Sequence, residues 1–329
     1  PIHWYRICPP GGGCAMAQRP LARHRTGNQG HETMNNYRSM LWPFIAALLL
    51  AMPLSVQANP PAELLLGNGK VISPGPYAKQ ALETEVDLSG PATGQGAIVL
   101  QLPGGKTVQL NRTGFERRSG ASSVWRGQSP QYDDSEAVIT VHNGLMVGRI
   151  VLDNQVYTLQ PGANGKHVLQ ELDSEAFPAC DSGQGQLVAM EGEPSGSEVA
   201  AAGEAAGTVI DLLSVYTPRV SSRLGGQAAA EAMIQAAVDN ANAAFANSGM
   251  GVQYRLVHTQ EVDYVTAGTT TDDLYWVTSD AGVAALRDQV GADMVSVIVD
   301  TSGSCGTGWV QRNPSSGFQS YAFQATDMD

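Results

Sequence analysis

Short apolar runs separated by turn-forming residues fill the first half of the chain. Between residues 64 and 172, no segment has helical spacing. Asn143-Gly144 stands between the apolar runs Ala137–Val141 and Leu145–Leu152, and Asn-Gly is a strong hairpin signal because both residues tolerate positive φ. The pattern predicts an all-β meander, arranged as a small sandwich or a curled sheet. Further strands are predicted at Ala97–Leu102, Lys106–Leu110, Gln155–Leu159 and His167–Leu172.

The hydrophobic period changes after residue 207. Val209–Tyr216 is a continuous apolar run, typical of a strand buried on both faces. Ala228–Asn247 has apolar residues at helical spacing and predicts a helix. Strands and helices then alternate, which predicts a right-handed α/β layer. The remaining predicted elements are a strand at Val252–Thr259, a helix at Ala281–Val290, and strands at Met294–Val299, Gly308–Val310 and Tyr321–Ala325.

The segment 181–207 separates these two regions by its composition. It is rich in Gly, Ala, Ser and Glu and has no basic residue, which is typical of a flexible, exposed linker. The chain is therefore predicted to have an α+β fold in two parts. A β-rich domain occupies residues 59–180, and an α/β domain occupies residues 208–329.

An export signal is predicted near the N-terminus. The run Leu41–Leu54 is apolar and uncharged, follows Arg38, and is followed by Val56-Gln57-Ala58. This order is typical of a secretory signal peptide, here residues 34–58. The run is shorter than the ~20 residues that a membrane-spanning helix needs. Residues 1–33 begin without Met and are interpreted as a mistranslated leader. We therefore expect a secreted or periplasmic protein with no stable membrane span after cleavage.

Composition and motifs narrow the function classes. The formal net charge of −12 argues against nucleic-acid binding, which requires a basic surface. The sequence has no nucleophile elbow and no phosphate-binding glycine motif. His31-Glu32-Thr33-Met34-Asn35 differs from the zinc motif H-E-x-x-H at its last residue. Single histidines on predicted strands are expected to be structural: His142, His167 and His258.

Seven short segments after residue 207 share their order and spacing with one known family. They are Val209–Pro218, Ala243–Gly249, Arg255–Thr259, Leu286–Asp288, Gly291–Val299, Ser304–Gly306 and Ser320–Phe323. Together they resemble the N-terminal part of a secreted bacterial reprolysin-like zinc metalloprotease, in the metzincin group that includes peptidyl-Asp metallopeptidases. The resemblance covers residues 208–329.

The resemblance implies a zinc endopeptidase that acts on peptide or protein substrates. The family holds zinc with H-E-x-x-H on a helix that follows the strand resembled by Tyr321–Ala325, and the Glu activates the bound water. That segment would lie beyond Asp329, so no zinc ligand and no catalytic residue is assigned, and this chain alone is expected to be inactive. The strand with Gly308, Trp309 and Val310 resembles the sheet edge that binds extended substrate. The alternative for Trp309 is a packed aromatic residue at a strand end.

The β-rich residues 59–180 fit the propeptide of such a zymogen. Cys180, just before the linker, loosely resembles a cysteine switch, in which a propeptide thiolate binds the zinc ion. The alternatives for Cys180 are a disulfide with Cys305 and an inert thiol. The resemblance also implies that Cys305 normally pairs with a cysteine beyond Asp329, which would leave Cys305 unpaired here.

Two other functions stay open at this point: a secreted β-rich binding module, and a prodomain-type protease inhibitor. The α/β region also has no predicted helix for one face of its sheet. We therefore expect Val297 and Val299 to lack cover and the chain to be marginally stable.

Overall fold

A computed structural model describes residues 60–119, 121–177, 207–301, 305–310 and 316–328. The leader, the signal peptide, Cys180 and the linker up to residue 206 lie outside the described residues. The described part of the α/β region begins at Gly207.

The first region forms a ten-stranded sheet in the order β1-β4-β5-β6-β7-β8-β9-β10-β3-β2. Neighbouring strands are antiparallel except for β1 and β4. The predicted all-β meander is therefore confirmed for β4 to β10. The elements are β1 (Ala62–Glu63), β2 (Leu65–Ile72), β3 (Ala78–Val86), α1 (Ser89–Thr93), β4 (Ala97–Gln101), β5 (Thr107–Ser119), β6 (Ser122–Gln128), β7 (Ser135–His142), β8 (Leu145–Leu152), β9 (Gln155–Pro161) and β10 (His167–Leu172).

Tight turns fix the register of this sheet. Asn143 and Gly144 have φ values of 49° and 81°, and His142 pairs with Leu145 across the turn. This is the two-residue hairpin that the sequence predicts. The core beneath the sheet includes Trp125, which is fully buried and whose indole N–H donates to the Gln95 carbonyl at 2.8 Å.

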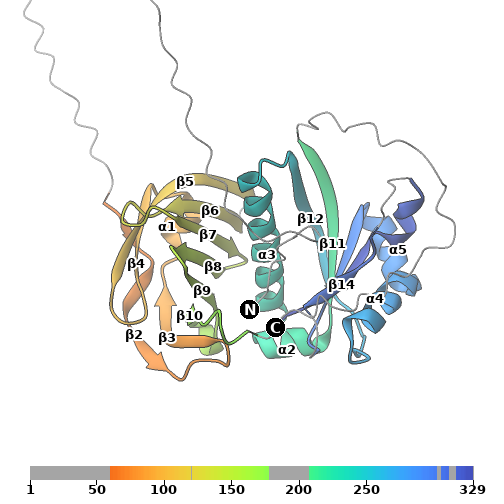
Figure 1. The fold of residues 1–329 in the computed structure, drawn as a ribbon, viewed down its shortest axis with the longest axis horizontal. Coiled ribbons are helices and arrows are strands. Elements are labelled where there is room, and N and C mark those ends of the chain that lie inside the picture. The colour runs from red at the N-terminus through yellow and green to blue at the C-terminus, as the bar shows by residue number, and fades with distance from the viewer. Residues whose placement is uncertain (1–59, 120, 178–206, 302–304, 311–315, 329) are drawn as a thin grey trace, which may run out of the picture. The chain divides into compact units, whose positions relative to one another are not determined.

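The second region forms a five-stranded sheet in the order β12-β11-β13-β15-β14 (Figure 1). The first four strands are parallel, and β14 runs antiparallel to β15. The predicted α/β layer is therefore confirmed. The elements are β11 (Thr208–Tyr216), α2 (Pro218–Leu224), α3 (Gln227–Asn247), β12 (Val252–Glu261), α4 (Thr270–Ser279), α5 (Ala281–Val290), β13 (Met294–Val299), β14 (Gly306–Gly308) and β15 (Phe323–Asp327).

The last two strands differ from the sequence-based prediction. Strand β14 covers Gly306–Gly308 and ends before Trp309 and Val310, while β15 begins at Phe323. Tyr321 belongs to a short 3-10 helix. Both predicted strands were thus placed about two residues away from their observed positions.

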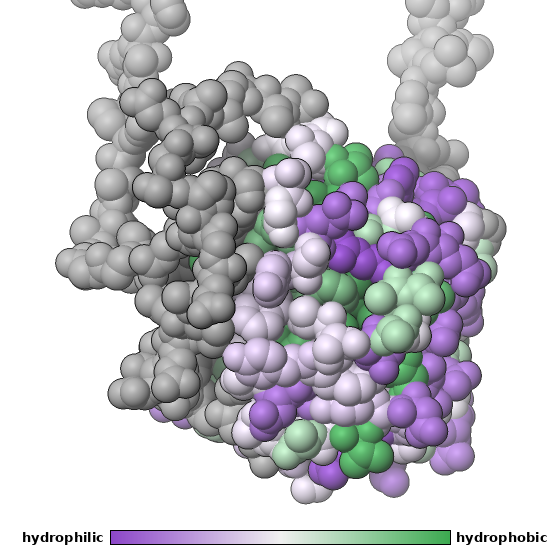
Figure 2. Space-filling model, turned by 90° about the vertical axis from the view of Figure 1, so that its right-hand side faces the viewer, coloured by the Kyte–Doolittle hydropathy of each residue, from purple (hydrophilic) through white to green (hydrophobic). Residues whose placement is uncertain are grey.

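Helices α4 and α5 cover one face of the second sheet. Val297 and Val299 are fully buried there, in a cluster with Leu274 and Val277 of α4. The expectation that these two valines lack cover is therefore wrong. The reason is α4, which the sequence analysis did not predict. Figure 2 shows the side of the molecule that carries α4 and α5, where apolar residues are scattered among polar ones.

Helix α3 lies between the two sheets (Figure 1). On one side it packs in a cluster that joins its Ala230 and Ile234 to Tyr216 of β11. On the other side it contacts β7 and β8 of the ten-stranded sheet. A helix buried on two sides needs small apolar residues around its circumference, and α3 is rich in alanine.

Candidate functional site

The free edge of the five-stranded sheet is the first candidate site. Strand β14 is the last strand in the sheet order, and among the described residues it pairs only with β15, with Thr307 opposite Ala325. An edge strand presents unpaired backbone donors and acceptors to an added peptide. Gly308 is exposed, and Val310 is 70% exposed just after the strand. These residues are accessible to an extended ligand, and their role in binding one stays a prediction.

Trp309 is a packed aromatic residue. Its indole N–H donates to Thr278 Oγ1 of α4 at 2.9 Å. Its ring makes edge-to-face contacts with Tyr275 and Tyr321, with centroids 5.2 and 5.6 Å away. The side chain therefore attaches the end of β14 to α4, which supports the packing alternative for Trp309.

A second contact fixes the same strand. The hydroxyls of Thr270, at the start of α4, and Thr307, in the middle of β14, lie 2.7 Å apart. Helix α4 itself begins with Thr269, whose side chain accepts the backbone N–H of Asp272 as an N-cap. Helix α4, which was not predicted from the sequence, thus holds the middle of β14 and the residue that follows it.

The three histidines on strands do not come together. His167 is 3% exposed, and its Nε2 accepts the Met146 backbone N–H at 3.1 Å. Burial lowers the pKa of His167, as it does that of His142. His142 lies beside Ser122 at 3.2 Å, and His258 pairs in register with Leu213.

A catalytic metal does not fit the described residues. The part of the chain that the structure describes has no group of three or more His, Cys, Asp or Glu side chains placed to hold a metal ion. Zinc sites in hydrolases need three such protein ligands. We therefore assign no zinc ligand among the described residues.

Cys305 is disulfide-bonded. The implication of the resemblance that Cys305 would be left unpaired here is therefore wrong, and the alternative of a disulfide between Cys180 and Cys305 stays a prediction. Cys180, the proposed cysteine switch, lies outside the described residues, and its role stays a prediction.

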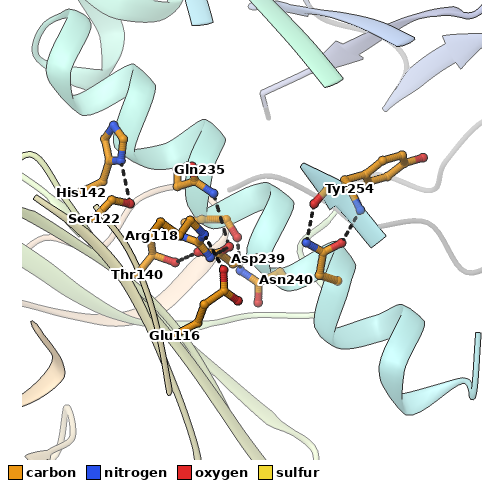
Figure 3. Close-up of polar contacts among 11 residues, drawn as sticks. Glu116, Arg118, Ser122, Thr140, His142, Gln235, Asp239, Asn240 and Tyr254 are labelled. Atoms are coloured by element: carbon orange, nitrogen blue, oxygen red, sulfur yellow. Dashed lines mark hydrogen bonds and ion pairs between the residues drawn. The ribbon is translucent and has the colours of Figure 1, made fainter. Parts of the chain in front are cut away.

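Sequence reasoning missed a buried charge between α3 and the strands of the ten-stranded sheet (Figure 3). Asp239 of α3 is completely buried. It forms an ion pair with Arg118 of β5, and it accepts the Thr140 hydroxyl of β7 at 2.5 Å. Gln235, one turn earlier on α3, donates to the same carboxylate at 3.3 Å. Burial raises the pKa of Asp239, while Arg118 and Thr140 act to lower it.

The sequence carries a weak signal for this network: Asp239 is one of two acidic residues on an alanine-rich helix. The partners could not be predicted, because Arg118 and Thr140 lie about 100 residues earlier in the chain. Their positions depend on how the two sheets meet at α3.

A hollow of about 460 Å³ lies beside this network. Its walls come from β5 to β7 on one side and from α3 and β12 on the other. At its rim, Asn247 Nδ2 donates to Glu136 Oε1 at 2.7 Å. Charged residues on the wall include Glu116, Arg126 and Glu136.

Comparison with known proteins identifies relatives of the second region. Residues 206–326 match the metallopeptidase family M12B, reprolysin-like. This match confirms the resemblance inferred from the sequence.

Two curated relatives align with different lengths of the chain, and the longer alignment exceeds the second region. A peptidyl-Asp metalloendopeptidase of Xanthomonas campestris pv. campestris is 26% identical over 250 residues, covering 70% of this chain and 59% of that protein. A peptidyl-Asp metalloendopeptidase of Pseudomonas aeruginosa is 35% identical over 113 residues, covering 34% of this chain and 18% of that protein. The chain thus spans less than two thirds of the length of these relatives.

One solved structure is similar at a lower level. Metalloproteinase-II from Bacteroides fragilis aligns with 70% of this chain and 74% of its own, with 10% identity and a TM-score of 0.36. Within the described ranges, no helix is both long and apolar enough to cross a membrane.

Proposed function

Because residues 206–326 match the reprolysin-like metallopeptidases, we propose that the chain is part of an exported, zinc-dependent endopeptidase. Its substrates are peptides or proteins, bound in extended form along β14. The observation that carries the proposal is the antiparallel edge strand at the end of a parallel sheet, within the segment that matches the family. The relatives named above make Asp-containing peptides the first substrates to test.

The β-rich residues 59–180 serve as the propeptide in this proposal. Two features support it: their position before the matching segment, and the alignment of relatives beyond residues 206–326. Cys180 is proposed as a zinc ligand of the silent zymogen, which requires that the disulfide of Cys305 is made with another cysteine. Cutting within 181–207 would break the chain connection between Cys180 and the enzyme.

The 329-residue chain alone is proposed to be inactive. The sequence contains no H-E-x-x-H, and the described residues offer no fitting metal site. The residues proposed at the substrate edge are Gly308, Trp309 and Val310. Gly308 and Val310 are exposed to the peptide, and the packed side chain of Trp309 holds the end of the strand.

The test compares two proteins under identical conditions. One is the 329-residue chain, and the other is expressed from the uninterrupted genomic reading frame, including any codons after that for Asp329. Both are incubated with a mixture of Asp-containing peptides and matched Asn-containing peptides, and the products are read by mass spectrometry.

We expect hydrolysis by the longer protein only, lost on adding a zinc chelator and restored by zinc. Hydrolysis that resists the chelator would contradict the metal assignment. Absence of hydrolysis by both proteins would overturn the proposed activity. Export is tested separately by N-terminal sequencing of the protein from the culture medium or periplasm, where a start after Ala58 is expected and an intact residue 34 would contradict the signal peptide.

A further inference from the structure

We propose that the β-rich residues 60–177 and the α/β residues 207–328 form a docked pair that stays together after the connecting segment is cut. The docking surface is the side of α3 that faces β5 to β8. This inference does not depend on the proposed enzymatic activity, because it rests on contacts between the two regions alone.

Two apolar patches supply the area of contact. Ala232, Met233 and Ala236 of α3 form a buried cluster with Val147 of β8. Three turns along α3, Ala243 packs with two other buried valines. These are Val124 of β6 and Val138 of β7. Apolar burial is worth roughly 25 cal/mol per Å², so these patches are the main source of affinity.

Alanine makes this contact close. Ala232 is fully buried, and Ala236 and Ala243 are nearly so. A side chain of one methyl group lets the helix backbone approach the sheet directly, and it loses no rotamer freedom on burial. The patch therefore fits a flat sheet surface and would be over-packed by a larger residue.

The Asp239 network lies between the two patches along α3. Two of its three partners, Arg118 and Thr140, come from the β-rich region. A buried carboxylate without a partner is strongly unfavourable. A docked arrangement shifted by one turn would bury Asp239 away from Arg118, so the ion pair selects one register. We assign specificity to this pair and affinity to the apolar patches.

The rim of the contact is polar. The Asn247–Glu136 hydrogen bond closes one end. A buried centre with apolar flanks and a polar rim is the organisation of specific protein interfaces.

The test cuts the intact chain and asks whether the pieces separate. A recognition sequence for a site-specific protease is placed within 181–206 of the full 329-residue chain. The purified protein is cut under reducing conditions, so that no disulfide can hold the pieces together. Size-exclusion chromatography with light scattering then gives the mass over a dilution series.

We expect the cut protein to keep the mass of the uncut chain at micromolar concentration. Arg118→Met leaves Asp239 buried without its cation, and should weaken the complex at least tenfold. Arg117→Met is the matched control, because Arg117 is the exposed neighbour on the same strand, and it should leave the dissociation constant unchanged.

Two results would overturn the inference: separation of the cut wild-type pieces at micromolar concentration, or equal dissociation constants for wild type, Arg118→Met and Arg117→Met. If Arg118→Met does not fold, Thr140→Val replaces it, since it removes only one hydrogen bond to the same carboxylate. Thr140→Val is expected to weaken the affinity between the two pieces at least threefold. An unchanged affinity would contradict the role of the network.

Discussion

His167 shows how a single buried side chain links stability to pH. Its Nε2 accepts a backbone N–H, so the neutral ring with a proton on Nδ1 fits the site. Burial lowers its pKa below the ordinary value of 6.5. As the pH falls below about 6.5, the unfolded chain takes up a proton at this residue before the folded chain does.

We therefore expect the free energy of unfolding to decrease between pH 7.5 and pH 5. His167→Gln keeps an acceptor for Met146 and removes the titration, so its stability should depend less on pH in this range. Urea unfolding at pH 7.5 and pH 5 gives the change of the free energy of unfolding with pH, for the wild type and for His167→Gln. Equal slopes in the two proteins would show that His167 does not control this dependence.

Gly127 has a different constraint, because it lies against the Trp125 ring. A Cβ at Gly127 would lie 2.2 Å from that ring and 2.8 Å from the Asn111 carbonyl oxygen, which neither group can accommodate without moving. Gly127→Ala should therefore lower the free energy of unfolding by about 2 kcal/mol.

Gly114→Ala is the matched control for this change. Gly114 lies in the same sheet, and its nearest contact to an added Cβ would be at an ordinary 3.8 Å. Urea unfolding of both variants makes the comparison. A similar loss for both would point to a general cost of alanine in this sheet rather than to the Trp125 ring.

At the scale of elements, α4 determines the position of the candidate edge strand. Thr278 accepts the Trp309 indole N–H, and Thr278→Val would leave that group unpaired. We expect the free energy of unfolding to fall by about 1 kcal/mol, and the fluorescence of Trp309 to shift to the red as the end of the strand loosens. Ser279→Ala, which changes the exposed hydroxyl next along α4, should change neither. A fluorescence spectrum of Thr278→Val equal to wild type would show that the bond does not fix the strand.

The order of most elements could be predicted, because each leaves a local pattern. The hairpin at Asn143 and the helix α3 agree with their sequence signals. Helix α4 was missed because it is short and has polar residues through its first turn. Its N-cap at Thr269 was the available signal.

Contacts between distant elements could not be predicted. The positions of Arg118 and Asp239 each follow from local patterns, yet their pairing depends on how two sheets pack on one helix. For the same reason, the sequence could not show which helix packs over Val297 and Val299. The proposed site residues at β14 come from a family resemblance, which carries long-range information that periodicity lacks.

At the scale of the whole molecule, α3 belongs to both cores. Opening either region would expose one of its buried sides. We therefore expect β7 and β13 to lose hydrogen-exchange protection at the same urea concentration in the wild-type chain. In Arg118→Met, protection of the two strands should be lost at different concentrations.

Mass spectrometry of peptides from the two strands makes this measurement. Arg117→Met serves again as the control and should behave as wild type. Separate transitions already in the wild-type protein would contradict a shared core.

The order of the second sheet has a consequence for how the protein can change over time. Helix α3 packs beside β12, at one end of that order, and β14 is at the other. Substitutions around β14 can therefore alter which peptides are recognised without disturbing the packing on α3. Under the proposed function, relatives should diverge in substrate preference while an α3 from one protein still accepts the β-rich region of another, so exchange of these regions between relatives is expected to give folded chimaeras.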